Sequence, residues 1–509
     1  MNDKIKLKKG DILHGKISKT KSGNAFLICD DLDRDIYINK RNTNRALDLD
    51  EVKVEITKTN KLEGKVIKIV ERNKKHFTGK LTKNKELYFV ELKDKDFFVP
   101  NKNLNGARDN QNVVVEFIEW NKHSKSPLGK VVKIIGDSGD NDSEMHTIMS
   151  EHGLPYEFEK DVLDESEKID FNISDLEIDK RLDMRDVLTF TIDGETAKDL
   201  DDAISVRWVN GVLELGIHIA DVTHYVKKGS LIDKEAYNRG NSVYLVDRCV
   251  PMLPSVLSNN VCSLNEKTDK LVYSFIFKLD KDGGVIDRGF SKGVINSNHR
   301  LTYKEVEDVL NGGETHSKEL KESLIYIDKI AKKIRSVRTK SSLSIETKEV
   351  KFILDENSKP VGVTQVKNLD SNKLIEEFMV LTNRSVCEFL SSKNKKIIHR
   401  AHGSPITDKV SELTEYLKNT GIDFVLDKND IKTTINNVLK EVKGTIHENM
   451  VNNLVVRSQQ KAVYQTDNIG HWGMGLEFYT HVTSPIRRYS DYIIHQMLNK
   501  TLPKGGYLK

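Results

Sequence analysis

The chain has 509 residues, of which 37% are apolar and 31% charged, with only 9 prolines and a net charge of +4. Such a length exceeds one ordinary core and the composition excludes a disordered or collagen-like chain, so three or more globular domains are expected. No run of about 18 apolar residues occurs and the first residues lack the apolar core of a signal peptide, so we expect a cytoplasmic protein without membrane contact.

The charge is unevenly distributed along the chain. Residues 1–135 contain 30 Lys and Arg against 19 Asp and Glu, whereas the remainder contains 51 against 58. A basic region attached to a mildly acidic body is typical of polyanion binding. A lysine-rich composition can equally well serve solubility, so charge alone leaves both interpretations open.

The basic region repeats itself. "HGKISK" at residues 14–19 is matched by "FTGKLTK" at 77–83, and "EGKVIKIVE" at 63–71 by "LGKVVKIIG" at 128–136, both at offsets of 64 to 65 residues. Each copy holds about five short Val/Ile/Phe/Tyr-rich runs separated by turn residues, as a small closed barrel of the OB type requires. We therefore predict two cold-shock or OB barrels, over residues 1–73 and 74–138.

Aromatic side chains in both copies are candidates for stacking on nucleic-acid bases while nearby lysines follow the phosphates. The alternative is that these rings fill the barrel cores. The candidates are Phe26, Tyr37, Phe89, Phe97 and Phe98.

Residues 139–180 are acidic and have a helical pattern interrupted by Gly153 and Pro155, which predicts a helical linker. From residue 181 onward, strands alternate with longer helices, and the apolar residues of 372–393 follow helical spacing. We therefore predict a large α+β domain over residues 181–509.

Five acidic side chains lie between residues 193 and 202, next to runs that are typical of buried strands. "VLTFTID" predicts a strand that ends at Asp193, and "AISVRWV" and "VLELGIHIADV" predict two more strands joined by a type I′ turn at Asn210-Gly211. Strand periodicity would separate Asp202 from Asp199 and Asp201, so only a curved loop brings the carboxylates together.

Converging carboxylates would repel one another and bind protons unless a divalent cation lay among them. Oxygen ligands alone suit Mg²⁺, with Mn²⁺ as the alternative, and do not suit zinc. The simpler interpretation is a solvated acidic loop.

A second candidate site is "HVTSPIRRYSDYIIHQML", residues 481–498. Ser484 and Pro485 predict a helix start, which places Arg487 and Arg488 in the first turn, where the helix dipole disfavours cations. A docked phosphate would explain that placement, and a partner carboxylate such as Asp491 is the alternative.

These segments, in this order, resemble the RNB domain of the RNase II / RNase R family of exoribonucleases, with RNase R the closer type. The basic copies resemble the tandem cold-shock domains of that family, and "EHGLPYEF" resembles its linker. The segments that carry the resemblance in the large domain are "TIDGETAKDLDDAIS", "IHIADVTHYV", "GNSVYLVDRCVPMLPSVLSNNVCSLNEKTDKL", "LIEEFM" and "TSPIRRYSDYIIH".

The resemblance implies processive 3′-to-5′ hydrolysis of single-stranded RNA with a free 3′ end to nucleoside 5′-monophosphates, by two divalent metal ions. We expect a monomer. The aspartates at the family's four active-site positions are Asp193, Asp199, Asp201 and Asp202, whereas Glu195 matches an acidic position outside that set.

Further residues match RNA contacts of the family. Tyr244 matches an aromatic that stacks near the terminal nucleotide, and Tyr303 with Glu377, or with its neighbour Glu376, matches positions that contact ribose. Arg487 is expected to neutralise the charge that develops on the phosphate, and Arg488 to bind RNA.

The chain departs from the family pattern at three places. Leu200 replaces a usual Phe, and Ile345 stands where the family has a base-clamping Phe, so weaker stacking of the 3′-terminal bases is expected. The chain also stops before the family's third OB domain, as a truncated or shortened relative would.

Two other functions remain open. The first is a catalytically weak, cold-shock-like RNA-binding protein with a vestigial RNB domain. The second is an endonuclease or DNase that uses the same metals.

Overall fold

The structure is a computed structural model that describes residues 7–20, 22–29, 32, 34–345, 349–422, 427 and 430–502. The chain divides into two compact units. The first comprises Met1–Tyr156 with Asp355–Lys359, and the second comprises Glu157–Leu354 with Pro360–Lys509.

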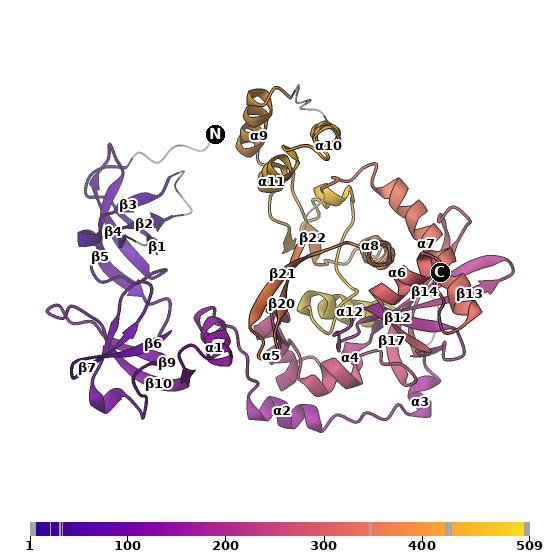
Figure 1. Ribbon diagram of the computed structural model, residues 1–509, viewed down its shortest axis with the longest axis horizontal. Helices are drawn as coiled ribbons and strands as arrows, with labels where there is room; N and C mark the ends of the chain where they lie inside the picture. The colour runs from indigo at the N-terminus through magenta and orange to yellow at the C-terminus, as the bar shows by residue number, and fades with distance from the viewer. Residues whose placement is uncertain are drawn as a thin grey trace. The chain divides into compact units, whose positions relative to one another are not determined.

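The first unit contains two closed five-stranded barrels, drawn in indigo and purple in Figure 1. In chain order the first barrel has β1 (Ile12–Lys19), β2 (Ala25–Ile28), β3 (Ile36–Ile38), β4 (Glu51–Lys58) and β5 (Glu63–Glu71). The second has β6 (His76–Asn84), β7 (Leu87–Glu91), β8 (Phe97–Val99), β9 (Gln111–Glu119) and β10 (Leu128–Asp137). The strands pair in the order β1-β2-β3-β5-β4 and, equivalently, β6-β7-β8-β10-β9. The identical pairing confirms the duplication that the sequence repeats predict.

The repeated glycines mark places where two strands of a barrel come very close together. A Cβ on Gly15 would lie 2.3 Å from the carbonyl oxygen of Ile28, and one on Gly79 would lie 2.2 Å from that of Glu91. Only glycine fits such an approach, which explains why the "GK" pair occurs in both copies. Short 3-10 turns, η1 (Lys40–Asn42) and η2 (Asn101–Asn103), follow the third strand of each barrel.

The predicted helical linker contains three helices: α1 (Asn141–Glu151), α2 (Lys160–Glu167) and α3 (Asp175–Ile178). Helix α1 packs on the second barrel, where the Asn112 amide donates to Glu144 at 3.0 Å and the hydroxyls of Thr78 and Ser150 lie 2.6 Å apart. The boundary between the compact units therefore falls after α1.

The second unit is built on a seven-stranded mixed sheet with the order β11-β18-β17-β14-β13-β12-β19. The β11–β18 and β12–β19 pairs are parallel and the others antiparallel. Asn210 and Gly211, between β13 and β14, have φ values of 51° and 79°, as the predicted type I′ turn requires. The strands are β11 (Leu182–Asp183), β12 (Thr189–Asp193), β13 (Asp202–Val209), β14 (Val212–Ala220), β17 (Asp269–Leu279), β18 (Val285–Asn296) and β19 (His299–Thr302).

Both faces of this sheet are covered, so β14 and β17 are buried along nearly their whole length. One apolar core includes residues of α6, α7, α8 and α12, and the other includes residues of α4, α5 and the π-helical turn η3. The bounds are α4 (Val222–Tyr225), α5 (Leu231–Arg239), η3 (Val256–Val261), α6 (Tyr303–Leu310), α7 (Lys318–Arg338), α8 (Asp370–Ser392) and α12 (Tyr489–Thr501). Helix α8 confirms the helix predicted from the apolar spacing of residues 372–393.

The remaining elements are smaller. Helices α9 (Thr407–Asn419), α10 (Ile431–Glu441) and α11 (Glu448–Ser458) share one apolar core, and Ile345 packs against it. The two-stranded sheets are β15 (Val243–Tyr244) with β16 (Cys249–Val250), β20 (Glu349–Leu354) with β21 (Pro360–Val366), and β22 (His399–Ala401) with β23 (Val463–Gln465). A 3-10 turn, η4 (Trp472–Met474), follows β23.

The two barrels followed by a large α+β unit confirm the predicted fold class. In the described ranges, no helix combines the length and the apolar character needed to cross a bilayer. The final residues 503–509 lie outside the described ranges, so the prediction about the C-terminal end is not addressed by the structure.

Candidate active site

A cavity of about 970 Å³ in the second unit collects most of the side chains that the sequence singles out. All four predicted aspartates line it, together with both arginines of the "SPIRR" segment. The predicted residues on its wall are Asp193, Asp199, Asp201, Asp202, Tyr244, Tyr303, Glu376, Arg487 and Arg488.

The acidic loop is curved, as convergence of the carboxylates requires. It leaves β12 at Asp193 and enters β13 at Asp202. Leu200 is only 1% exposed, its N–H donates to the Ser263 hydroxyl at 3.1 Å, and its carbonyl accepts from the Leu264 N–H at 3.0 Å. This buried leucine holds the loop against the core, so the acids on either side of it face the cavity.

Each of three aspartates has a defined partner. Asp193 accepts a hydrogen bond from the N–H of the adjacent Gly194 at 2.7 Å, and Asp199 accepts one from the Tyr244 hydroxyl at 2.9 Å. Asp201, 4% exposed, accepts from the Ile486 N–H at 2.8 Å through Oδ1. Its Oδ2 lies 3.4 Å from Arg487 Nε and accepts no hydrogen bond from the described part of the chain.

The protonation of the cluster follows mainly from its burial. Burial raises the pKa of Asp193 and, more strongly, that of Asp201. Burial, with the Asp193 charge as the second cause, raises the pKa of Asp202 to about 7. Mutual repulsion, the cause expected from the sequence, contributes less than loss of hydration.

As they stand, no three His, Cys, Asp or Glu side chains of the described ranges are grouped tightly enough to form a metal site. Two observations still fit a divalent cation at this wall. The Asp201 Oδ2 atom is buried without a hydrogen bond. The raised pKa values of Asp201 and Asp202 also show that their carboxylates need a nearby positive charge to stay ionised. Such an oxygen-only donor set is the one that Mg²⁺ or Mn²⁺ prefers.

The arginine segment differs from the prediction in where its helix begins. Helix α12 starts at Tyr489, and residues 485–487 form a turn before it, because the Ser484 carbonyl accepts from both Arg487 N and Arg488 N. The predicted first-turn position of the two arginines is therefore wrong. The alternative partner, Asp491, is correct for Arg488, whose Nη2 donates to it at 2.7 Å, whereas Arg487 lies beside Asp201.

Tyr244 and Tyr303 lie where the prediction needs them, on the cavity wall. Glu377 does not, because it is 1% exposed, bonded to Arg338, and absent from this wall. Its neighbour Glu376, about half exposed, lines the cavity instead. Adjacent residues of α8 point about 100° apart, and here Glu376 faces the cavity while Glu377 turns to Arg338.

The aromatic candidates of the barrels divide into two groups. Phe26 pairs with Tyr37 across β2 and β3, with ring centroids 5.7 Å apart, and Phe89 pairs with Phe98 at the equivalent place in the second barrel, 5.6 Å apart. All four rings are at least partly accessible. Phe97 is fully buried, so for this ring the core alternative is correct.

Several cavity residues were missed by the sequence reasoning. Asn383 and His481 line the wall, and burial lowers the pKa of His481 to about 3, so that this ring is neutral at pH 7. His481 is the first residue of the predicted segment 481–498, but the sequence reasoning gave it no role. No spacing rule links Asn383, about 190 residues from the acidic loop, to this cavity.

Comparison with known proteins matches three parts of the chain to family models. The family model for the RNB domain matches residues 181–504, that for a cold shock domain matches 90–159, and that for the Ribonuclease B OB domain matches 15–69. Ribonuclease R of Thermotoga maritima is 38% identical over 511 residues, which covers 98% of this chain and 72% of the relative.

Solved structures give the same result. Mycoplasma genitalium RNase R in complex with ribose methylated single-stranded RNA matches with a TM-score of 0.89 at 26% identity, covering 96% of this chain and 79% of that one. Yeast Ssd1, described as a pseudonuclease, matches with a TM-score of 0.70 at 20% identity, covering 98% of this chain and 70% of that one, which shows the fold alone. Because a pseudonuclease shares the fold, activity must be argued from the side chains of the cavity.

Proposed function

Because the chain belongs to the RNB family and is of the ribonuclease R type, we propose that it is an exoribonuclease that hydrolyses single-stranded RNA from a free 3′ end. The observation that carries the proposal is that Asp193, Asp199, Asp201 and Asp202 line one cavity together with Arg487. A protein that only binds RNA would gain nothing from four acidic side chains in one cavity, because their charges repel the phosphates.

In this proposal the four aspartates hold two divalent cations, Mg²⁺ or Mn²⁺. When bound, these cations supply positive charge that polarises the phosphodiester and makes water a better nucleophile. Asp201 is held in place by the Ile486 N–H, and its Oδ2, which lies 3.4 Å from Arg487 Nε and accepts no hydrogen bond in the described ranges, is the oxygen that would bind a cation.

Arg487 acts on the phosphate itself. Its guanidinium lies beside Asp201, and its side chain is 42% exposed and lines the same cavity, so it can donate to the non-bridging oxygens as their charge increases. Arg488 contributes charge but stays tied to Asp491.

The nucleoside side of the substrate would meet the aromatic wall. Tyr244 would stack on the terminal base, a role supported by its 54% exposure and by its hydrogen bond to Asp199. Tyr303 and Glu376, which line the same cavity, would contact the ribose, and a hydrogen bond to its 2′-hydroxyl would favour RNA over DNA. The barrels would bind upstream nucleotides on the Phe26–Tyr37 and Phe89–Phe98 pairs. Because the RNA would then stay bound between cleavages, the enzyme would release successive nucleoside 5′-monophosphates without dissociating from it.

The decisive test uses a 5′-labelled single-stranded RNA with and without Mg²⁺. Progressive shortening from the 3′ end and release of nucleoside 5′-monophosphates are expected, and a full-length band that persists with wild-type protein would refute the proposal. Circular RNA and single-stranded DNA serve as controls, because cleavage of either would indicate an endonuclease or a DNase.

Asp202→Asn separates chemistry from binding. It removes a metal ligand without altering the barrels, so hydrolysis should be lost while RNA affinity in the absence of metal stays within about twofold of wild type. A comparable loss of both would contradict this division of labour.

A further inference from the structure

The turn that carries both arginines, residues 482–488, is fastened to α12 by one buried carboxylate. Asp491 is 0% exposed, and its Oδ1 accepts from the Ser484 N–H at 2.9 Å and from Arg488 Nη2 at 2.7 Å. Its Oδ2 accepts from the Ser490 hydroxyl at 3.0 Å. One side chain thus binds both the start of the turn and the arginine at its end.

Ser484, whose backbone N–H is bonded to Asp491, also contacts Arg487 through its side chain. Its hydroxyl accepts from Arg487 Nη2 at 2.9 Å, and the serine itself is only 3% exposed. On the other side of the Arg487 guanidinium, its Nε lies 3.4 Å from Asp201 Oδ2. The guanidinium is therefore held between a buried hydroxyl and a carboxylate of the acidic loop.

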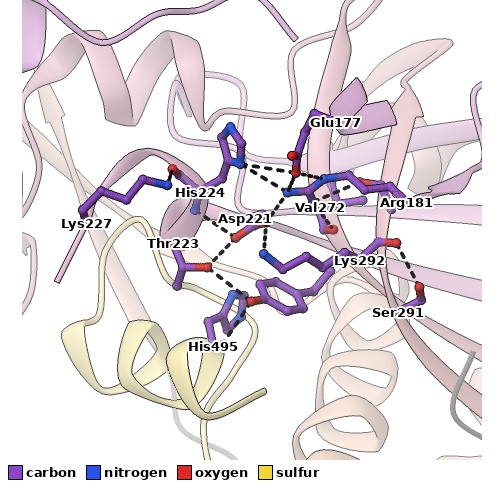
Figure 2. A network of polar contacts seen from close by, with 12 residues as sticks. Glu177, Arg181, Asp221, Thr223, His224, Lys227, Val272, Ser291, Lys292 and His495 are labelled. Carbon is purple, nitrogen blue, oxygen red and sulfur yellow. Dashed lines mark hydrogen bonds and ion pairs between the residues drawn. The ribbon is translucent and has the colours of Figure 1, made fainter. Parts of the chain in front are cut away.

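Helix α12, which supplies Asp491, is itself anchored in a buried polar network (Figure 2). His495 Nε2 lies 2.7 Å from the carbonyl oxygen of Val482, and its own carbonyl accepts from the Tyr273 hydroxyl at 3.1 Å. That hydroxyl lies 3.2 Å from Thr223 Oγ1, which donates to Asp221 at 2.6 Å. Helix α12 is thus bonded through His495 to Tyr273 of the central sheet and to Val482, at the first residue of the 482–488 segment.

Such a constraint matters for a long side chain. A free arginine side chain loses rotamer entropy when it is fixed, and a donor stabilises a transition state only if it is already aimed at the developing charge. A misplacement of about 1 Å can cost up to about 100-fold in rate.

We propose that Ser484 and Asp491 are positioning residues, which aim Arg487 at the scissile phosphate and keep Arg488 beside the turn. This inference rests on the proposed function, in which Arg487 stabilises the phosphate. In this proposal both residues act through the arginines.

The test is a double-mutant cycle between Ser484→Ala and Arg487→Ala, with Ser490→Ala as the matched control. Ser490 also bonds to Asp491 but holds no arginine. Ser484→Ala should lower the single-turnover rate about 10- to 100-fold, with RNA affinity and melting temperature nearly unchanged, and Ser490→Ala should leave the rate near wild type. In an Arg487→Ala background, Ser484→Ala should change the rate by no more than about twofold.

Additive effects of Ser484→Ala and Arg487→Ala would overturn the role of Ser484. Asp491→Asn retains the size and one acceptor oxygen but loses the charge that holds Arg488, and it should lower the rate about tenfold in a manner coupled to Arg487. Additivity of Asp491→Asn with Arg487→Ala would remove Asp491 from the proposal.

A second measurement does not depend on hydrolysis. In protein labelled with ¹⁵N-arginine, the Nε–H signal of Arg487 can be identified by its loss in Arg487→Ala. Its heteronuclear Overhauser effect should fall in Ser484→Ala and not in Ser490→Ala, which would show that the serine immobilises the guanidinium even if wild-type protein proved unable to cleave RNA. An unchanged Overhauser effect in Ser484→Ala would refute the inference while leaving the proposed function standing.

Discussion

Asp221, at the centre of the network in Figure 2, offers a stability prediction whose size follows from the structure. Its carboxylate lies 2.9 Å from Arg181 Nη2 and 3.3 Å from Lys292 Nζ, and the side chains of Asp221 and Arg181 are both 0% exposed. At an effective dielectric constant of about 20, opposite charges about 3 Å apart attract by about 5 to 6 kcal/mol, most of which offsets their lost hydration. Asp221→Asn removes the attraction but leaves Arg181 dehydrated, so we expect the second unit to lose about 3 to 5 kcal/mol of its free energy of unfolding.

The assay is urea unfolding followed by tryptophan fluorescence in a Trp120→Phe background. Trp120 is the one tryptophan of the first unit, so the signal then reports Trp208 and Trp472 of the second. The matched control is Asp183→Asn, because Asp183 lies 2.7 Å from Arg185 but the two side chains are 48% and 33% exposed. An exposed pair of similar geometry should contribute less than about 1 kcal/mol.

The acid dependence of Asp221→Asn adds a second check. Burial alone would raise the pKa of Asp221, but the charges of Arg181 and Lys292 outweigh it and hold the pKa below its usual value. Its contribution is therefore present above about pH 4 and is lost as the pH falls further, so the difference between wild type and Asp221→Asn should shrink in acid. Equal losses for Asp221→Asn and Asp183→Asn at pH 7, or a difference that grows in acid, would refute the reasoning.

Three further predictions concern other parts of the molecule. Burial lowers the pKa of His218 to about 3, so the free energy of unfolding should fall by about 1.4 kcal/mol per pH unit as the pH drops from about 6.5 toward 3. In His218→Asn, the free energy of unfolding measured with urea should depend less steeply on pH. Phe26→Ala and Phe89→Ala should each weaken single-stranded RNA binding by about 1 to 3 kcal/mol in fluorescence titrations, whereas Phe97→Ala should instead destabilise its barrel by about 3 to 5 kcal/mol. Removal of divalent cations with EDTA should abolish hydrolysis while gel-shift binding of RNA persists, and loss of binding as well would argue that the barrels are not the main RNA-binding surface.

The barrels were predictable because their information is local and repeated. Gly15 and Gly79 recur at corresponding positions since each strand pair needs the same close approach, and alternating apolar residues mark the strands between them. The alternation does not distinguish which of two neighbouring aromatic rings faces the barrel core. Phe97 and Phe98 are neighbours, and the strand pleat buries the first and leaves the second accessible.

The site was predictable as a set of residues and less so as a geometry. The strand that ends at Asp193 and the hairpin at Asn210-Gly211 were read from periodicity and turn residues. The sequence could not decide whether Glu376 or Glu377 lines the cavity, because that depends on the rotation of α8 about its axis. That rotation is decided by the residues against which the helix packs.

From the amino-acid order alone came the duplicated barrels, the loop that contains the aspartates and the membership of both arginines in one site. Only the tertiary structure decided that Asp201 binds the backbone of Ile486, 285 residues away, and that Arg487 faces the acids while Arg488 turns to Asp491. The physical reason is that periodicity specifies which residues share a face of one element, whereas the direction of a side chain in a loop or turn is set by partners from distant segments.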